Sequence, residues 1–187
     1  MRIVAGRFKG RPLSAPKGDR TRPTSDKARQ ALFNVLEHAD WAPALDGARI
    51  VDLFAGSGGL GFEAMSRGGA FCLFVDIDAG ARGAIRENIE ALQLFGNTRL
   101  HRRSATDLGE KPAKLGQPFN LVFLDPPYGK GLAPSALAGL IDGNWVTEDA
   151  LAVLEVAADE DVPDFAGWIP VNARIWGAAK VVFLTRC

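Results

Sequence analysis

From residue 48 onward, short apolar runs alternate with stretches whose apolar residues recur at helical spacing, and this alternation constrains the fold more than any other feature. The apolar runs predict strands over Ala48–Phe54, Phe71–Val75, Thr98–His101, Asn120–Leu124 and Leu151–Val156. The stretches between them predict helices over Leu60–Ser66, Ala79–Leu92, Thr106–Leu115 and Pro134–Ile141. Because successive strand–helix units form a parallel sheet with helices on both faces, the predicted fold class is α/β and doubly wound.

The two ends of the chain follow other patterns. Ala173–Gly177 and Lys180–Thr185 predict two strands in an antiparallel hairpin. Five parallel strands followed by such a hairpin resemble the seven-stranded, Rossmann-like plan of class I methyltransferases rather than the plain nucleotide-binding plan. Near the N-terminus, residues 24–38 predict a helix that Thr24 or Ser25 can cap. We therefore expect a basic extension over residues 1–23 and one domain over residues 24–187.

Charge is distributed unevenly, although 22 basic and 22 acidic side chains balance overall. Residues 1–30 carry a net charge of +7, and the other 157 residues carry −7. A basic arm on an acidic body favours a polyanionic partner such as a nucleic acid. The alternative is a solvated extension without a partner, and the composition leaves both open.

Several classes of protein are disfavoured by composition. No apolar run approaches the ~20 residues that span a bilayer, and no secretory signal follows the basic N-terminus. Cys72 and Cys187 do not make a disulfide framework, and His38 and His101 do not complete a zinc cluster with them. We expect a cytoplasmic protein that uses no metal.

A glycine-rich turn follows the first predicted strand. Gly56, Gly58 and Gly61 satisfy the spacing G-x-G-x-x-G, and Asp76 lies 20 residues after Gly56. Such glycines let the backbone approach a cofactor, while an acid at the end of the next strand accepts ribose hydroxyls. This motif fits a dinucleotide as well as S-adenosylmethionine (SAM). Asp52 favours SAM, because a carboxylate within the first strand can meet the cationic end of an amino-acid moiety.

Two acids compete for the ribose. Asp76 directly follows an apolar run and is expected at the tip of its strand, where the ribose binds. Asp78 is better placed to cap the helix that begins near Ala79. Ile77 lies between them and is expected either against the adenine ring or in ordinary packing.

The second motif, Asp125-Pro126-Pro127-Tyr128, directly follows a predicted buried strand. Two prolines fix the backbone, so the Pro126 carbonyl points rigidly. Together the Asp125 carboxylate and the Pro126 carbonyl can accept both hydrogens of an exocyclic amine, and the Tyr128 ring can stack on the base that bears it. Two such acceptors favour a pyramidal nitrogen whose lone pair points at an electrophilic methyl group.

Both motifs resemble those of SAM-dependent methyltransferases that act on exocyclic amines of nucleobases. The N-terminal portion is similar to the RsmD-type 16S rRNA guanine-N2 methyltransferases, and the similarity rests on Arg2–Gly6, Gly10-Arg11, Arg22–Asp26 and Leu32–Asn34. The resemblance implies a cytoplasmic bacterial enzyme that transfers the methyl group of SAM to N2 of a loop guanine. The partner it implies is 16S rRNA or the assembling small ribosomal subunit, and we expect a monomer.

The resemblance also implies roles for individual residues of this chain. The catalytic residues it implies are Asp125, Pro126, Pro127 and Tyr128. The cofactor-binding residues it implies are Thr24, Asp52, Phe54, Ala55, Gly56, Ser57, Gly58, Asp76, Ile77, Ser104 and Ala105. Glu155, at the end of the fifth predicted strand, matches an acid seen in the family or is a surface acid.

Three rival functions remain. A DNA adenine-N6 methyltransferase uses the same four-residue motif, but we find no segment long enough for a separate target-recognition domain. An NAD-dependent oxidoreductase would use the glycine-rich turn and would need a proton-transfer residue, for which His101 is the candidate. A non-catalytic RNA-binding protein would not need an intact Asp125–Tyr128 motif.

Overall fold

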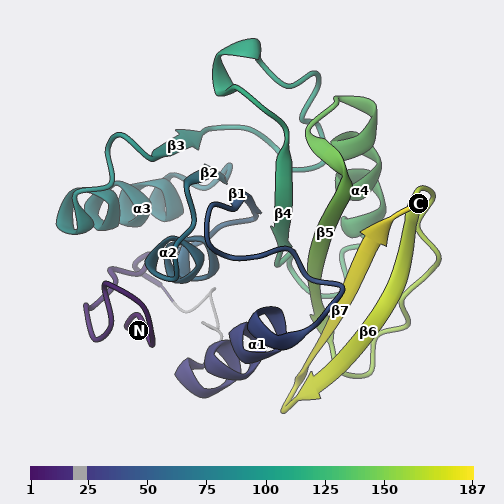
Figure 1. Ribbon diagram of the computed structural model, residues 1–187, viewed down its shortest axis with the longest axis horizontal. Helices are drawn as coiled ribbons and strands as arrows, with labels where there is room; N and C mark the ends of the chain where they lie inside the picture. Colours follow the sequence, from purple (N-terminus) through teal and green to yellow (C-terminus); the bar gives the residue numbers. More distant parts are fainter. Residues whose placement is uncertain (19–24) are drawn as a thin grey trace.

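The fold is known from a computed structural model that describes residues 1–18 and 25–187. Within this part of the chain, seven strands form one sheet in the order β3-β2-β1-β4-β5-β7-β6 (Figure 1). The strands are β1 (Arg49–Leu53), β2 (Phe71–Val75), β3 (Thr98–His101), β4 (Phe119–Leu124), β5 (Val146–Ala157), β6 (Trp168–Trp176) and β7 (Ala179–Arg186). The first five are parallel, whereas β7 runs antiparallel to both β5 and β6. The predicted seven-stranded α/β plan with a C-terminal hairpin is confirmed.

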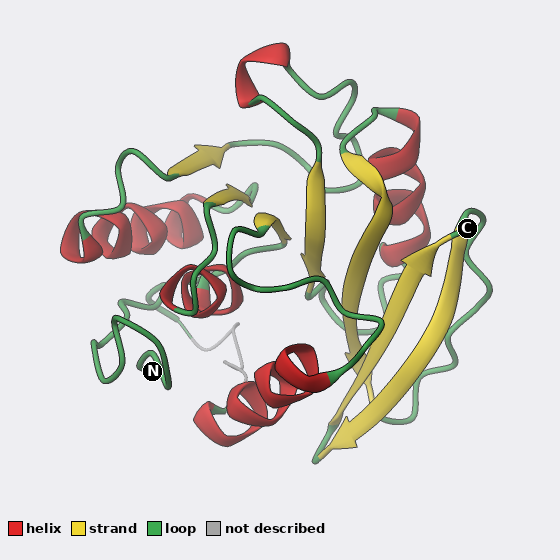
Figure 2. Ribbon diagram, viewed as in Figure 1, coloured by secondary structure: helices red, strands yellow, loops and turns green. Residues whose placement is uncertain are grey.

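Helices cover both faces of the sheet (Figure 2). The helices are α1 (Asp26–His38), α2 (Gly59–Ser66), α3 (Ala79–Leu92), α4 (Ala133–Asp142) and the short 3-10 helix η1 (Ala113–Leu115). Apolar residues of α1, α2 and α3 pack against one face, where Phe33 of α1 contacts Phe123 of β4 with ring centroids 5.8 Å apart. Leu137 and Leu140 of α4 pack against the other face. Burial of a strand between two apolar layers explains why the parallel strands read as continuous apolar runs.

One predicted helix is wrong. Of the stretch Thr106–Leu115, only the last three residues are helical, as η1. Gly109 adopts a left-handed conformation with φ of 62°, and Pro112 is extended, so a continuous helix cannot form across them. Strand β5 and both hairpin strands are longer than predicted. β5 begins earlier, where Val146 pairs with Phe119 of β4, and the hairpin strands pair with each other out to Trp168 and Arg186.

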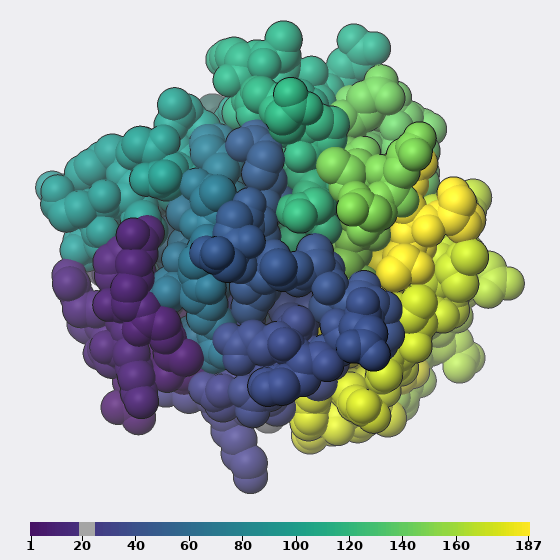
Figure 3. Space-filling model, viewed as in Figure 1, coloured from purple at the N-terminus to yellow at the C-terminus, as the bar shows by residue number. Residues whose placement is uncertain are grey.

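The N-terminal segment of residues 1–18 is packed on the domain, while its basic side chains are exposed. Ile3 and Leu13 are buried in the core beneath α1 and α2. Glu63 of α2 accepts hydrogen bonds from the backbone N–H groups of Val4 and Ala5 at 2.9 and 3.0 Å. Figure 3 shows the N-terminal segment, in purple, in contact with the rest of the molecule. The domain boundary predicted at residues 23 and 24 falls outside the described residues.

Helix α1 begins as its sequence predicts. The Ser25 hydroxyl accepts a hydrogen bond from the backbone N–H of Ala28 at 3.1 Å and caps the helix. No helix in the described part of the chain is long and apolar enough to cross a membrane.

Candidate active site

The parallel strands deliver their acids to one edge of the sheet. Asp52 lies near the end of β1, Asp76 follows β2, Asp125 follows β4, and Glu155 lies near the end of β5. All four line one cleft with a volume of about 910 Å³. Ligands of doubly wound sheets bind at this carboxyl edge, next to the point where the strand order reverses. Here that point lies between β1 and β4, since β2 and β4 flank β1.

The glycine-rich turn forms one wall of this cleft. Gly56 and Gly58 have φ values of 58° and 78°, a conformation that favours glycine. Gly61 must lack a side chain, because a Cβ there would lie 2.5 Å from the Phe74 ring. Its backbone N–H instead donates to the Asp52 carboxylate at 3.0 Å. The turn therefore holds Asp52 from behind while its own backbone faces the cleft.

Burial raises the pKa of Asp52 well above its usual range, although the bond from Gly61 opposes this shift. The negative charges of Asp125 and Asp76 raise it further. Five acids line the cleft, since Asp78 lies beside the other four, and a ligand with cationic groups would relieve the repulsion between those that are ionised.

The structure separates the roles of Asp76 and Asp78. Asp76 is half-buried, and its two oxygens accept the backbone N–H groups of Gly56 and Asp78, both at 2.8 Å. Asp78 caps α3 by accepting from the N–H of Ala81 at 2.7 Å, as its sequence position predicts. Ile77 is 67% exposed and lines the cleft, so its apolar surface is available to a flat ring.

The second motif closes the other end of the cleft. Asp125 and Pro126 follow the last residue of β4, and the Tyr128 ring is 45% exposed beside them. The Tyr128 hydroxyl donates a hydrogen bond to Glu155 Oε1 at 2.8 Å. Burial, followed by the negative charge of Glu155, raises the pKa of Asp125 to about 8. Asp125 therefore holds a proton at neutral pH more readily than an ordinary aspartate.

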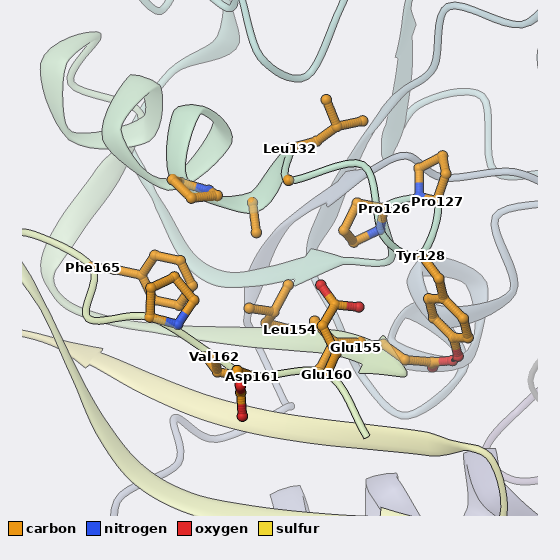
Figure 4. A pocket seen from close by; sticks show the side chains of 15 residues that line it. Pro126, Pro127, Tyr128, Leu132, Leu154, Glu155, Glu160, Asp161, Val162 and Phe165 are labelled. Atoms are coloured by element: carbon orange, nitrogen blue, oxygen red, sulfur yellow. Dashed lines mark hydrogen bonds between the residues drawn. The ribbon is translucent and has the colours of Figure 1, made fainter. Parts of the chain in front are cut away.

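A smaller cavity of about 140 Å³ opens on the far side of the same motif (Figure 4). Pro126, Pro127 and Tyr128 line both this cavity and the large cleft, and so does Glu155. Apolar side chains such as Phe165 form its opposite wall. The two spaces therefore meet at the Asp125–Tyr128 motif.

Sequence reasoning missed part of the cleft wall. Residues from the docked N-terminal segment line it, namely Met1, Ala15, Pro16, Lys17 and Gly18. Arg29 of α1 also lines it and is buried, with its guanidinium 3.5 Å from Glu63 and 2.8 Å from Asp26. The sequence does carry a signal for Arg29. It lies at helical spacing before Leu32 and Phe33, so it shares the buried face of the helix with them.

Some residues expected near the cofactor lie elsewhere. Ser104 and Ala105 follow β3 and do not line the cleft; the Ser104 hydroxyl bonds to Thr106 Oγ1 at 2.9 Å, and Ala105 is buried in the core on the α4 face. Gly58 supports the turn without lining the cleft. His101, the residue that an oxidoreductase would need, does not line it either. Thr24 lies outside the described residues.

Among residues 1–18 and 25–187, no three histidine, cysteine or acidic side chains gather as metal ligands.

Comparison with known proteins identifies the family. Residues 1–185 match the family described as Conserved hypothetical protein 95. The chain belongs to this family. It is 35% identical over 178 residues to ribosomal RNA small subunit methyltransferase D of Escherichia coli, which covers 95% of this chain and 85% of that protein. It is also 38% identical over 167 residues to YlbH of Bacillus subtilis, covering 89% and 88% of the two chains.

The fold of this family member matches solved structures over its full length. The Escherichia coli protein yhhF superposes with a TM-score of 0.81 at 32% identity, covering 100% of this chain and 97% of the other. These matches confirm the resemblance to the RsmD-type family and show that the chain is a methyltransferase.

Proposed function

We propose that this protein transfers the methyl group of SAM to N2 of a guanine in 16S rRNA. The observation that carries the proposal is the meeting of the two motifs in one cleft, with the glycine-rich turn and Asp76 at one end and Asp125–Tyr128 at the other. The name of the Escherichia coli relative supports an rRNA substrate. A target in bacterial rRNA would place the enzyme in the cytoplasm, and we expect it to act as a monomer.

The cleft suits SAM in size and charge. Its volume of about 910 Å³ lies within the range of small-molecule sites. Asp76 faces the expected ribose, Ile77 offers an apolar surface for adenine, and Asp52 with the backbone of Phe54–Ser57 faces the amino-acid end. When bound, SAM supplies an electrophilic methyl group next to the Asp125 motif.

The chain itself contributes positioning. The Asp125 carboxylate and the Pro126 carbonyl accept the two hydrogens of the guanine amine, and Tyr128 stacks on the base. Bound SAM would supply the methyl group and leave as the sulfide, while the amine lone pair would form the new N–C bond and solvent would take the proton that the amine loses. Holding both reactants in line supplies most of the acceleration. The base must leave its stack to reach the cleft, which favours a loop nucleotide.

One experiment tests the proposal. The protein is incubated with labelled SAM and either naked rRNA, assembled small subunits or DNA, and the modified base is mapped. We expect label on guanine N2 of 16S rRNA. Label only on adenine in DNA, or no transfer with any substrate while SAM still binds, would refute it.

A further inference from the structure

A second carboxylate stands beside Asp125, and the reaction as described above does not use it. Leu124 of β4 pairs in register with Leu154 of β5, so the next residues, Asp125 and Glu155, come side by side at the sheet edge. Alternation along the two strands puts Glu155 on the same face as Val153, which pairs with Phe123. Both carboxylates line the large cleft, and Glu155 also lines the smaller cavity.

Glu155 is only 9% exposed, which is costly for a carboxylate unless it has polar partners. Tyr128 supplies one, through the hydrogen bond of 2.8 Å from its hydroxyl to Oε1. Figure 4 shows the two side chains meeting beside the paired prolines. A carboxylate has about four acceptor positions, so it can accept from a ligand alongside other donors.

The target base carries a hydrogen-bond donor that such an acceptor can bind. Next to its N2 amine, guanine carries an N1–H donor. Next to its N6 amine, adenine carries N1 as an acceptor, which a carboxylate repels. We propose, in an inference that rests on the proposed function, that Glu155 accepts the N1–H of the target guanine while Asp125 holds the N2 amine. The pair of carboxylates then selects guanine over bases whose N1 is an acceptor.

The test compares two target bases in one rRNA fragment that carries the mapped site. In one fragment the target is guanine, and in the other it is 2-aminopurine, which keeps the amine but has an acceptor at N1. We expect the native protein to prefer guanine in kcat/KM. Glu155→Gln should narrow this preference by about 10- to 100-fold, since it loses a hydrogen bond to a charged group and its amide can donate to N1.

Three variants keep the result interpretable. Glu155→Asp retains the charge and should retain the preference at a lower rate. Tyr128→Phe removes the hydroxyl that Glu155 accepts from and should also retain the preference. Glu148→Gln changes an exposed glutamate earlier in β5 and should alter nothing. SAM binding by calorimetry shows that each variant is folded.

The outcomes separate the two proposals. Glu155→Gln could instead slow methylation of guanine and of 2-aminopurine equally, as Tyr128→Phe would if the Tyr128 ring were displaced. Glu155 would then only position Tyr128, and the inference would be overturned. If the native protein itself fails to methylate guanine N2, the proposed function fails first.

Discussion

The surroundings of the acids in the cleft stabilise a negative charge to different extents. Asp76 is held by two backbone N–H groups, whereas Asp125 stands half-buried beside Glu155. Ionisation of Asp125 therefore leaves two like charges side by side at the sheet edge. We therefore expect the protonation state of Asp125 to control methyl transfer.

A pH profile of methyl transfer checks this role. With a pKa of about 8, Asp125 is mostly protonated at pH 7 and is then a poor acceptor for the amine. We expect kcat/KM to rise with pH up to about 8, falling roughly tenfold per pH unit on the acid side. Glu155→Gln removes a nearby negative charge and should shift the rise to lower pH. A flat profile between pH 6 and 9 would contradict the account.

The raised pKa of Asp125 also makes the stability of the folded protein depend on pH. The unfolded chain ionises Asp125 near pH ~3.9, while the folded chain keeps its proton up to a pH of about 8. Raising the pH between these values therefore favours the unfolded state. We expect Asp125→Asn to melt at a higher temperature than the native protein at pH 8 and at nearly the same temperature at pH 4. Calorimetric melting at both values measures the difference.

Substitutions of Asp76 and Asp78 should have different effects on SAM binding and on the stability of the fold. Asp76→Ala should weaken SAM binding by about 1.5–3 kcal/mol, because charge-assisted bonds to the ribose are lost. Asp78→Ala should affect binding much less but lower the free energy of unfolding by about 1 kcal/mol, since it removes the cap of α3. Titration calorimetry that gave the reverse order would move the ribose contact to Asp78.

At the scale of elements, buried polar side chains join the N-terminal segment to the helices. Asn88 of α3 bonds both ways with the backbone of Ser14, at 2.7 and 3.0 Å, and donates to the Ser57 carbonyl at 3.1 Å. It thus links the segment to the glycine-rich turn. Glu63 of α2 binds the same segment at Val4 and Ala5.

Glu63→Ala tests how much this junction contributes. Glu63 is fully buried and lies 2.9 Å from the Arg67 guanidinium and 3.5 Å from that of Arg29. Its loss would leave buried cations without this partner, so we expect the free energy of unfolding to fall by about 3–5 kcal/mol. Denaturant unfolding measures it. Glu37→Ala removes the exposed partner of Arg67 and should cost at most about 1 kcal/mol. Equal losses in the two variants would refute the argument.

At the scale of the whole molecule, the docked segment places basic side chains on the surface of the domain, one of them in the cleft wall. Residues 1–18 contain five basic side chains and no acid, namely Arg2, Arg7, Lys9, Arg11 and Lys17. The remaining residues carry a net charge of −5. Lys17 lies in the cleft wall itself, so an RNA backbone approaching the cleft meets the basic part of an otherwise acidic protein.

RNA binding should therefore depend on salt through this segment. Changing Arg7, Lys9 and Arg11 together to Ala should flatten the log–log salt slope by about 2 units, since each phosphate contact contributes about 0.7–0.9. The apparent KM for RNA should rise while SAM affinity stays the same. Lys114→Ala, on the exposed surface of η1, serves as the control. An unchanged slope in the folded triple variant would mean that these charges only solvate the surface.

Much of the fold follows from the sequence alone. The strands β2 and β3 and the helix α3 occupy the predicted residues, because short apolar runs and the Asp78 cap are local signals. The Asp125 motif was recognisable for the same reason, since adjacent residues carry all of its chemistry. The helix expected over Thr106–Leu115 failed where Gly109 and Pro112 interrupt the backbone.

Only the tertiary structure determined which distant residues meet. The N-terminal residues read as an extension, yet buried side chains 58 to 74 positions away hold this segment against the domain. The resemblance implies Ser104 and Ala105 beside the cofactor, yet they are not among the residues that line the cleft. Glu155 stands beside Asp125 because two strands separated by a helix pair in one particular register. Periodicity predicts where a strand lies, whereas register is decided by how all the apolar faces pack together.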